Sequence, residues 1–196
     1  MHQLIQGYSE KLIGALRMDA MGEIPTLAEA LREAWKNGRH IYLCGNGGSA
    51  GNAIHLANDL IFGAGMKYGV GLRVEALSAN AAILTCLGND IGYENIYCEQ
   101  VRVKGDPGDI LIVLSGSGNS PNVVKALETA NAKGMKTFAI LGFTGGKCKD
   151  IAQHPIHFEI DDMQIAEDMQ LIVGHICMQW LCANPVSGDA RVAETA

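Results

Sequence analysis

Residues 41–50 read Ile41-Tyr42-Leu43-Cys44-Gly45-Asn46-Gly47-Gly48-Ser49-Ala50, an apolar strand that runs directly into a loop of glycines and a serine and then into a helix. A second segment of this kind reads Ile110-Leu111-Ile112-Val113-Leu114-Ser115-Gly116-Ser117-Gly118-Asn119-Ser120. A helix N-terminus presents unpaired N–H groups and a partial positive charge, so it favours anions. Glycine lets the backbone approach a ligand, and serine adds a rotatable donor. Two such loops at the carboxyl ends of strands predict a site for a small, phosphorylated, hydroxyl-rich ligand.

The rest of the chain alternates between strand and helix patterns. Strands are predicted near residues 40–44, 72–77, 109–114, 136–142 and 155–160. Helices are predicted up to about residue 35 and near residues 49–62, 81–87, 93–103, 120–133, 146–152 and 164–183. Short apolar strands such as 110–114 are typical of a parallel sheet that is covered on both faces. The pattern predicts one doubly wound α/β domain over residues 1–183, followed by a polar and disordered tail over 184–196.

Composition narrows the classes of function. The chain has 196 residues with 48% hydrophobic content, which is enough for one domain with a sizeable core. Its formal net charge of −6 gives no electrostatic footprint for nucleic acid. No apolar stretch reaches the roughly 20 residues of a membrane span, and no signal peptide is recognisable at the start. The six cysteines lack C-x-x-C spacing. We therefore expect a cytoplasmic protein with reduced, mostly buried thiols and no nucleic-acid or membrane partner.

Several motifs together resemble the sugar isomerase (SIS) domain family, and within it the phosphoheptose isomerases. The resemblance covers residues 1–183 and is carried by the loop from Cys44 to Ala50, His55, Gly88-Asn89-Asp90 and the loop from Ser115 to Ser120. It implies a flavodoxin-like, five-stranded parallel sheet with helices on both faces. It also implies extra N-terminal helices, within residues 1–37, that pack a homotetramer with active sites between subunits. The implied reaction interconverts sedoheptulose 7-phosphate and D-glycero-D-manno-heptose 7-phosphate.

Aldose–ketose isomerisation moves a proton between C1 and C2 through an enediol, so it needs a base, a proton donor and a group that polarises the carbonyl. His55 and Asp59 are four residues apart on a predicted helix and so share a face. The resemblance implies that His55, Asp59, Glu167 and His175 bind zinc, with Asp59 and His175 as the acid/base pair. Two histidines with oxygen ligands suit Zn²⁺.

Glu167 and His175 are separated by eight residues, about 12 Å along a straight helix axis. Both side chains can reach one ion only if they lean toward each other. Otherwise the helix bends, or a neighbouring chain supplies one ligand. The sequence leaves these three arrangements open.

The chain departs from the family pattern at four positions. Asp59 replaces a glutamate, which shortens the side chain by one methylene, roughly 1.5 Å, and a misplacement of about 1 Å is costly for a catalytic group. Glu167 replaces a glutamine and adds negative charge. Gly63 stands in place of an arginine, and Gly116 in place of a threonine. We expect the phosphate site to be retained and the sugar end to be altered.

The two loops also supply the expected substrate contacts. We expect Ser115, Ser117 and Ser120 to bind the phosphate and Ser49 to contact sugar hydroxyls. The other expected substrate contacts are Asn46, Gly47, Asn89, Asp90, Gly116 and Glu167. Each assignment has a structural alternative. The serines would otherwise cap a helix, Glu167 would be a first-turn acid favoured by the helix dipole, and Asn89-Asp90 would shape a turn. His55 and Asp59 would be an ordinary surface pair.

Three functions remain open at this level. The first is a phosphosugar isomerase, favoured by His55, the carboxylate at position 59 and His175. The second is a non-catalytic relative that binds a phosphosugar or a replication initiator. The third is a sugar-phosphate sensor. Such a sensor would normally carry a DNA-binding domain, and we expect no room for one in this chain. Apolar residues over 169–182 exceed what one helix face needs, which predicts subunit packing. The sequence does not specify which sugar phosphate is used.

Overall fold

The computed structural model describes residues 1–65 and 69–186 of the chain. Its centre is a five-stranded, all-parallel sheet in the order β2-β1-β3-β4-β5. The strands are β1 (His40–Cys44), β2 (Arg73–Ala76), β3 (Ile110–Ser115), β4 (Lys136–Leu141) and β5 (His154–His157). This is the strand order of the flavodoxin-like fold, so the predicted fold class is confirmed. The predicted strands all form, within two or three residues at their ends.

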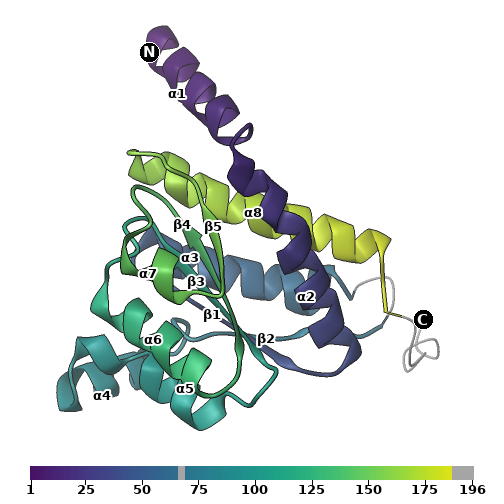
Figure 1. Cartoon of the computed structure of the whole chain (residues 1–196), viewed down its shortest axis with the longest axis vertical. Helices are drawn as coiled ribbons and strands as arrows, with labels where there is room; N and C mark the ends of the chain where they lie inside the picture. The colour runs from purple at the N-terminus through teal and green to yellow at the C-terminus, as the bar shows by residue number, and fades with distance from the viewer. Residues whose placement is uncertain (66–68, 187–196) are drawn as a thin grey trace.

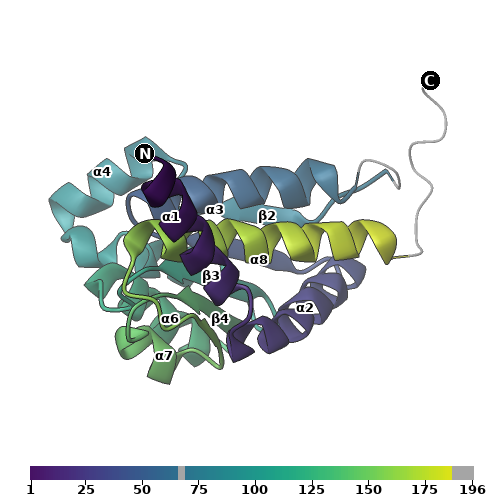
Figure 2. The ribbon, with the colours of Figure 1, turned by 90° about the horizontal axis from the view of Figure 1, so that it is seen from above.

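Helices cover both faces of the sheet (Figures 1 and 2). The α-helices are α1 (His2–Ala15), α2 (Ile24–Lys36), α3 (Gly48–Asn58), α4 (Ala81–Asp90), α5 (Cys98–Lys104), α6 (Pro121–Ala132), α7 (Gly146–Ile151) and α8 (Met163–Ala183). The described residues also form short 3₁₀ turns at η1 (Asp19–Glu23) and η3 (Tyr93–Asn95), and a π turn at η2 (Asp59–Gly63). The predicted helix over 49–62 is therefore α-helical only to Asn58, and the one predicted over 93–103 is broken after η3.

The core has two layers because successive residues of a strand point to opposite faces. Along β3, Ile110 and Ile112 pack with α2, α3 and α8, whereas Leu111 and Val113 pack with α5, α6 and α7. Four of the six cysteines are buried, and burial raises the pKa of the Cys177 thiol to about 12. The buried thiols are thus kept in their unreactive, protonated form.

Helix α1 projects beyond the body of the domain (Figure 1). Lys11 pairs with Asp162 at 2.6 Å, and the Tyr8 hydroxyl donates to Asp168, which raises the pKa of Tyr8 to about 12. Leu4 and Ile5 are 68% and 56% exposed. Two polar contacts to α8 and its N-cap residue thus hold a helix whose apolar side chains lie largely open to solvent.

No helix among residues 1–65 and 69–186 is long and apolar enough to span a membrane. Residues 187–196, most of the polar tail for which we expect disorder, lie outside the described residues.

Candidate active site

The two glycine-rich loops follow β1 and β3, which are neighbours in the sheet, so both lie at the same edge. A pair of side-chain amides joins the first loop to the helix that follows the second loop. Asn46 donates to Asn122 at 2.9 Å, and Asn122 donates back to Asn46 at 2.8 Å. The Tyr93 hydroxyl also donates to Asn46, at 3.0 Å. Asn46 therefore fixes the first loop against the start of α6 as well as lying at the predicted sugar site.

The second loop is shaped by two of its own serines. The Ser115 hydroxyl accepts from the Gly118 N–H at 3.0 Å, and the Ser117 hydroxyl accepts from the Asn119 N–H at 3.3 Å. Gly118 adopts φ +66°, and a Cβ there would lie 1.9 Å from the carbonyl oxygen of Gly145, so only glycine fits. Loop and neighbouring backbone are thus held in one tight arrangement.

Ser120 is the residue that precedes α6, and its side chain makes no capping hydrogen bond within the described part of the chain. The N–H groups of Val123 and Val124 donate instead to the Ser120 carbonyl. The structural alternative, a serine that merely caps the helix, therefore does not describe Ser120. Ser120 is half-buried at this edge of the sheet.

Ser49 lies differently from the expected sugar contact. Its side chain is only 3% exposed, and its hydroxyl accepts from the Gln170 side chain on α8 at 3.0 Å. Gln170 in turn accepts from Asn52 at 3.0 Å. Within one chain, Ser49 is therefore committed to holding α3 against α8. The sequence gives no sign of this role for Gln170, because the partner is 121 residues away.

Asn89 and Asp90 end α4 and are exposed. Asn89 donates to Asp90 at 2.8 Å, and Asp90 accepts from the Cys86 thiol at 3.5 Å. The following turn carries Tyr93, whose hydroxyl reaches Asn46. The structure thus links this segment to the first loop through Tyr93.

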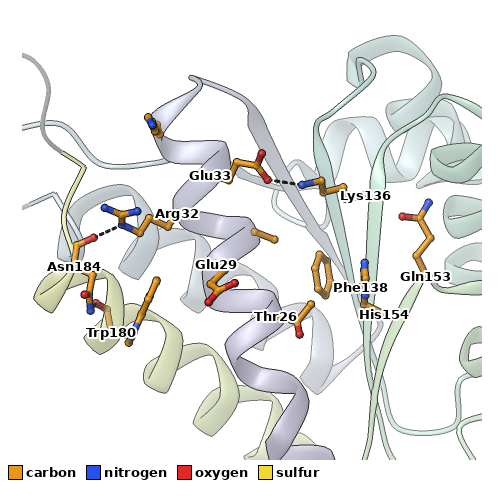
Figure 3. Close-up of a pocket in the computed structure, with 12 residues that line it drawn as sticks. Thr26, Glu29, Arg32, Glu33, Lys136, Phe138, Gln153, His154, Trp180 and Asn184 are labelled. Carbon is orange, nitrogen blue, oxygen red and sulfur yellow. Dashed lines mark hydrogen bonds and ion pairs between the residues drawn. The ribbon is translucent and has the colours of Figure 1, made fainter.

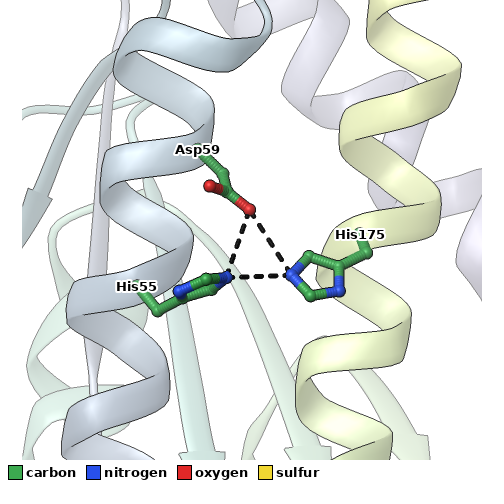
Figure 4. A group of neighbouring side chains, drawn as sticks. All are labelled: His55, Asp59 and His175. Carbon is green, nitrogen blue, oxygen red and sulfur yellow. Dashed lines mark hydrogen bonds and ion pairs between the residues drawn. The ribbon is translucent and has the colours of Figure 1, made fainter.

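Three candidate metal ligands meet between α3 and α8 (Figure 4). The Nε2 atoms of His55 and His175 are 3.0 Å apart, and each lies 3.4 Å from Oδ2 of Asp59. Zinc bonds of about 2.0–2.2 Å in a tetrahedral arrangement place neighbouring ligand atoms about 3.3–3.6 Å apart. The two His–Asp distances match this spacing, and the His–His distance is about 0.3 Å shorter than it. The imidazoles are half exposed, whereas the Asp59 side chain is 18% exposed.

The local backbone explains how Asp59 reaches this position. Asp59 begins the π turn η2, in which the Ala64 N–H donates to the Asp59 carbonyl at 3.1 Å, five residues back. Single π turns inside helices are frequent at functional sites. The freed carbonyl of Leu60 accepts from Leu72. A Cβ at Gly71 would lie 1.7 Å from the Ile61 carbonyl oxygen, so the glycine lets the backbone of residue 71 pack directly on this turn.

Glu167, the fourth candidate, lies apart from the group of three. Both of its carboxylate oxygens would be 2.4 Å from a Cβ at Gly48. Its carboxylate is therefore placed against the first turn of α3, where the helix dipole favours an anion. Of the arrangements that the sequence leaves open, the structure brings His55, Asp59 and His175 together within one chain, with Glu167 two turns before His175 on α8.

Two of the departures from the family pattern have visible neighbours. A Cβ at Gly116 would lie 2.6 Å from Sδ of Met163, so the methionine fills the space of the missing side chain. A Cβ at Gly63 would meet Cε of Met178 at 3.5 Å, an ordinary contact. The Met163 thioether therefore lies beside the second loop, at the position where the family pattern has the hydroxyl of a threonine.

A groove of about 860 Å³ lies at the opposite edge, near the amino ends of β4 and β5 (Figure 3). Its walls come from α2, α8 and the two strands. Two of its charged side chains have partners within the groove, because Glu33 pairs with Lys136 and Arg32 donates to the Asn184 carbonyl at 2.8 Å. Because it lies at the opposite edge of the sheet, the groove is separate from the loops and from the His–Asp–His group.

The chain is similar in sequence and in fold to known proteins. Residues 7–142 match the family model described as the SIS domain. The phosphoheptose isomerase of Akkermansia muciniphila is 39% identical over 155 residues, which cover 79% of this chain and 82% of that protein. The phosphoheptose isomerase of Nitratiruptor is 41% identical over 144 residues, covering 74% and 76%. The structure of phosphoheptose isomerase GmhA from Neisseria gonorrhoeae superposes with a TM-score of 0.84 at 27% identity, covering 93% of this chain and 98% of that one.

Proposed function

Because the chain belongs to the SIS-domain family and, within it, to the phosphoheptose isomerases, we propose that it interconverts sedoheptulose 7-phosphate and D-glycero-D-manno-heptose 7-phosphate. The observation that carries this proposal is the meeting of His55, Asp59 and His175 within 3.4 Å of one another. An imidazole and a carboxylate are the acid and base that an enediol reaction at neutral pH needs.

The proposed proton transfer uses Asp59 and His175. One of them takes the proton from the carbon next to the carbonyl, while the other protonates the carbonyl oxygen, which yields the enediol. In the second half, the group that took the carbon-bound proton gives a proton to the former carbonyl carbon, while the other group removes the proton from the hydroxyl on the adjacent carbon, so the carbonyl forms there and both groups are regenerated. When bound, zinc would polarise the sugar oxygens as a Lewis acid. His55, Asp59 and His175 would hold it, with Glu167 as the fourth candidate.

Deuterium exchange tests the proposed reaction directly. The chain is incubated in deuterated buffer with a panel of ketose phosphates that includes sedoheptulose 7-phosphate, and the products are analysed by NMR. We expect deuterium at C1 of the ketose and at C2 of the aldose that forms. Binding of a sugar phosphate without any exchange would instead identify a non-catalytic phosphosugar-binding protein.

We propose that Ser115, Ser117 and Ser120 bind the phosphate, with the backbone of Gly116. The proposed sugar side comprises Asn46, Gly47, Asn89, Asp90 and Glu167, whereas Ser49 is buried against Gln170. The position of both loops at one sheet edge supports this assignment.

A Ser117→Ala, Ser120→Ala double variant tests the phosphate site. A hydrogen bond to a charged group contributes about 1.5–3 kcal/mol, so we expect the dissociation constant for sugar phosphate to rise by at least about 10-fold. Calorimetric titration measures this change. Ser9→Ala on the exposed face of α1 is the matched control. Unchanged affinity in the double variant would refute the assignment.

We further propose a homotetramer in the cytoplasm, packed through α1 and α8. The exposed Leu4 and Ile5 of α1 and the exposed Ile176 of α8 support such packing. Light scattering at micromolar concentration should give a mass near four times 20.9 kDa. A monomeric mass would refute the oligomer and any active site shared between subunits.

A further inference from the structure

Gly174 lies where α8 crosses α3, and its missing side chain is filled from the other helix. A Cβ at position 174 would be 2.2 Å from Cδ2, 2.7 Å from Cδ1 and 3.0 Å from Cγ of Leu56. Leu56 and Gly174 are the sequence neighbours of His55 and His175, whose Nε2 atoms are 3.0 Å apart. We propose that Gly174 is a positioning residue. It allows the close approach of α3 and α8 that brings His55, Asp59 and His175 together.

The surrounding core leaves Leu56 little room to move aside. Leu56 is 3% exposed and belongs to the same packed cluster as Val173 and Cys177, which are both fully buried. An ordinary contact of a Cβ lies at 3.4–4 Å, so a methyl group at 174 requires a displacement of more than 1 Å. Protein cores are packed too densely to absorb such a shift by a simple rotation of one side chain.

Sliding of one helix along the other is also restricted. Asn52 on α3 donates to the Glu167 carbonyl and to the Gln170 side chain, each at 3.0 Å, and Gln170 donates to Ser49 at 3.0 Å. Gln170 is completely buried, so breaking this network leaves a buried amide without partners. The remaining response to a larger residue at 174 is a local separation of the two helices beyond this network, on the side of His55 and His175.

Separation acts directly on the three functional side chains, because His55 and Asp59 belong to one helical segment and His175 to the other. Metal–ligand distances tolerate changes of about 0.2 Å, and misplacement of a catalytic group by about 1 Å costs about 100-fold in rate. Helix propensity favours alanine over glycine inside a helix such as α8. The glycine is therefore explained by the crossing and not by the helix itself.

The test is Gly174→Ala, with Gly51→Ala as the matched control. Gly51 lies in α3, is exposed, and a Cβ added there would have no heavy atom within 4 Å. Circular dichroism and thermal unfolding establish folding, and titration with Co²⁺ reports the ligand geometry through its visible absorption. We expect Gly51→Ala to behave as the parent. We expect Gly174→Ala to fold and to bind Co²⁺ and Zn²⁺ at least 10-fold more weakly.

A compensating variant separates the steric role from general destabilisation. Leu56→Ala in the Gly174→Ala background removes the atoms that meet the new methyl group, so it should bring the Co²⁺ spectrum back toward that of the parent. If Gly174→Ala does not fold, the double variant should restore both folding and the spectrum. A double variant that folds without recovering the spectrum contradicts the proposal.

The proposal rests on the proposed function only in its choice of the three residues as the site, and a crystal structure of Gly174→Ala separates the two. We expect the His55–His175 Nε2 distance to exceed the parent's by about 1 Å, the size of the displacement that costs activity. An unchanged distance in a folded variant overturns the positioning role, whatever the parent's activity. Absence of deuterium exchange in the parent overturns the proposed function and leaves the distance measurement valid.

Discussion

Asp59→Asn is expected to lower turnover by about 100-fold or more, the scale of general acid–base catalysis, while the affinity for sugar phosphate changes little. The amide has nearly the shape of the carboxylate but cannot accept a proton from carbon at neutral pH. The proposed phosphate site lies at the carboxyl end of β3, a different part of the structure from η2, which carries Asp59. The loss should therefore appear in kcat with only a small change in KM.

Steady-state kinetics and deuterium exchange measure this effect. Asp150→Asn on exposed α7 is the control for loss of one surface carboxylate. Asp59→Glu is the more discriminating variant, because it restores the length that the family pattern has at this position. Higher activity of Asp59→Glu on sedoheptulose 7-phosphate would show that Asp59 is a base adjusted to another substrate or pose. If Asp59→Asn and His175→Ala both keep full solvent exchange, these residues are not the acid/base pair.

The fold was predictable because its signals are local. Apolar strands such as residues 110–114, each followed by glycine and serine, predict both the strand and its position at a ligand-binding edge. The pairing of Asn46 with Asn122 was not predictable in the same way. Those residues are 76 positions apart, and only the adjacency of β1 and β3 brings them together.

The site was predictable in part. The helical spacing of His55 and Asp59 indicates a shared face. The family resemblance alone indicated His175, which the structure brings to them from α8. Two features had no local signal. The change from α-helix to π turn at Asp59 depends on backbone contacts with Gly71 and Leu72. The burial of Ser49 depends on Gln170. Both features arise from tertiary packing. At Asp59 this packing also ends the regular α-helix that was expected for residues 49–62.

The position of Glu167 shows the same limit. Its spacing from His175 is compatible with a shared ion only if the side chains lean toward each other. The structure places the Glu167 carboxylate against Gly48 instead, where the absence of a side chain makes room for it. The sequence shows that residue 48 is a glycine, but it does not show that α8 brings Glu167 close to that glycine.

Protein purified without chelators is expected to contain one zinc ion per chain, held by His55, Asp59 and His175. Because both His–Asp distances of 3.4 Å match a tetrahedral ion, removal of either imidazole should weaken zinc binding strongly. Loss of a mere supporting partner already costs about 10–100-fold in metal affinity, so we expect at least about 100-fold for His55→Ala and for His175→Ala. Elemental analysis and competitive chelator titration measure stoichiometry and affinity.

Glu167→Gln distinguishes two roles for the fourth candidate. As a ligand, Glu167 would contribute as much as the histidines, and its loss would be comparable. As a carboxylate seated at the first turn of α3, it acts on the ion only through its charge, so we expect the affinity of Glu167→Gln to fall by less than that of His55→Ala. His2→Ala on exposed α1 controls for the loss of an unrelated histidine. Zinc binding that survives in both His55→Ala and His175→Ala, or the absence of stoichiometric metal together with no response of activity to added zinc, would exclude a metal site between α3 and α8.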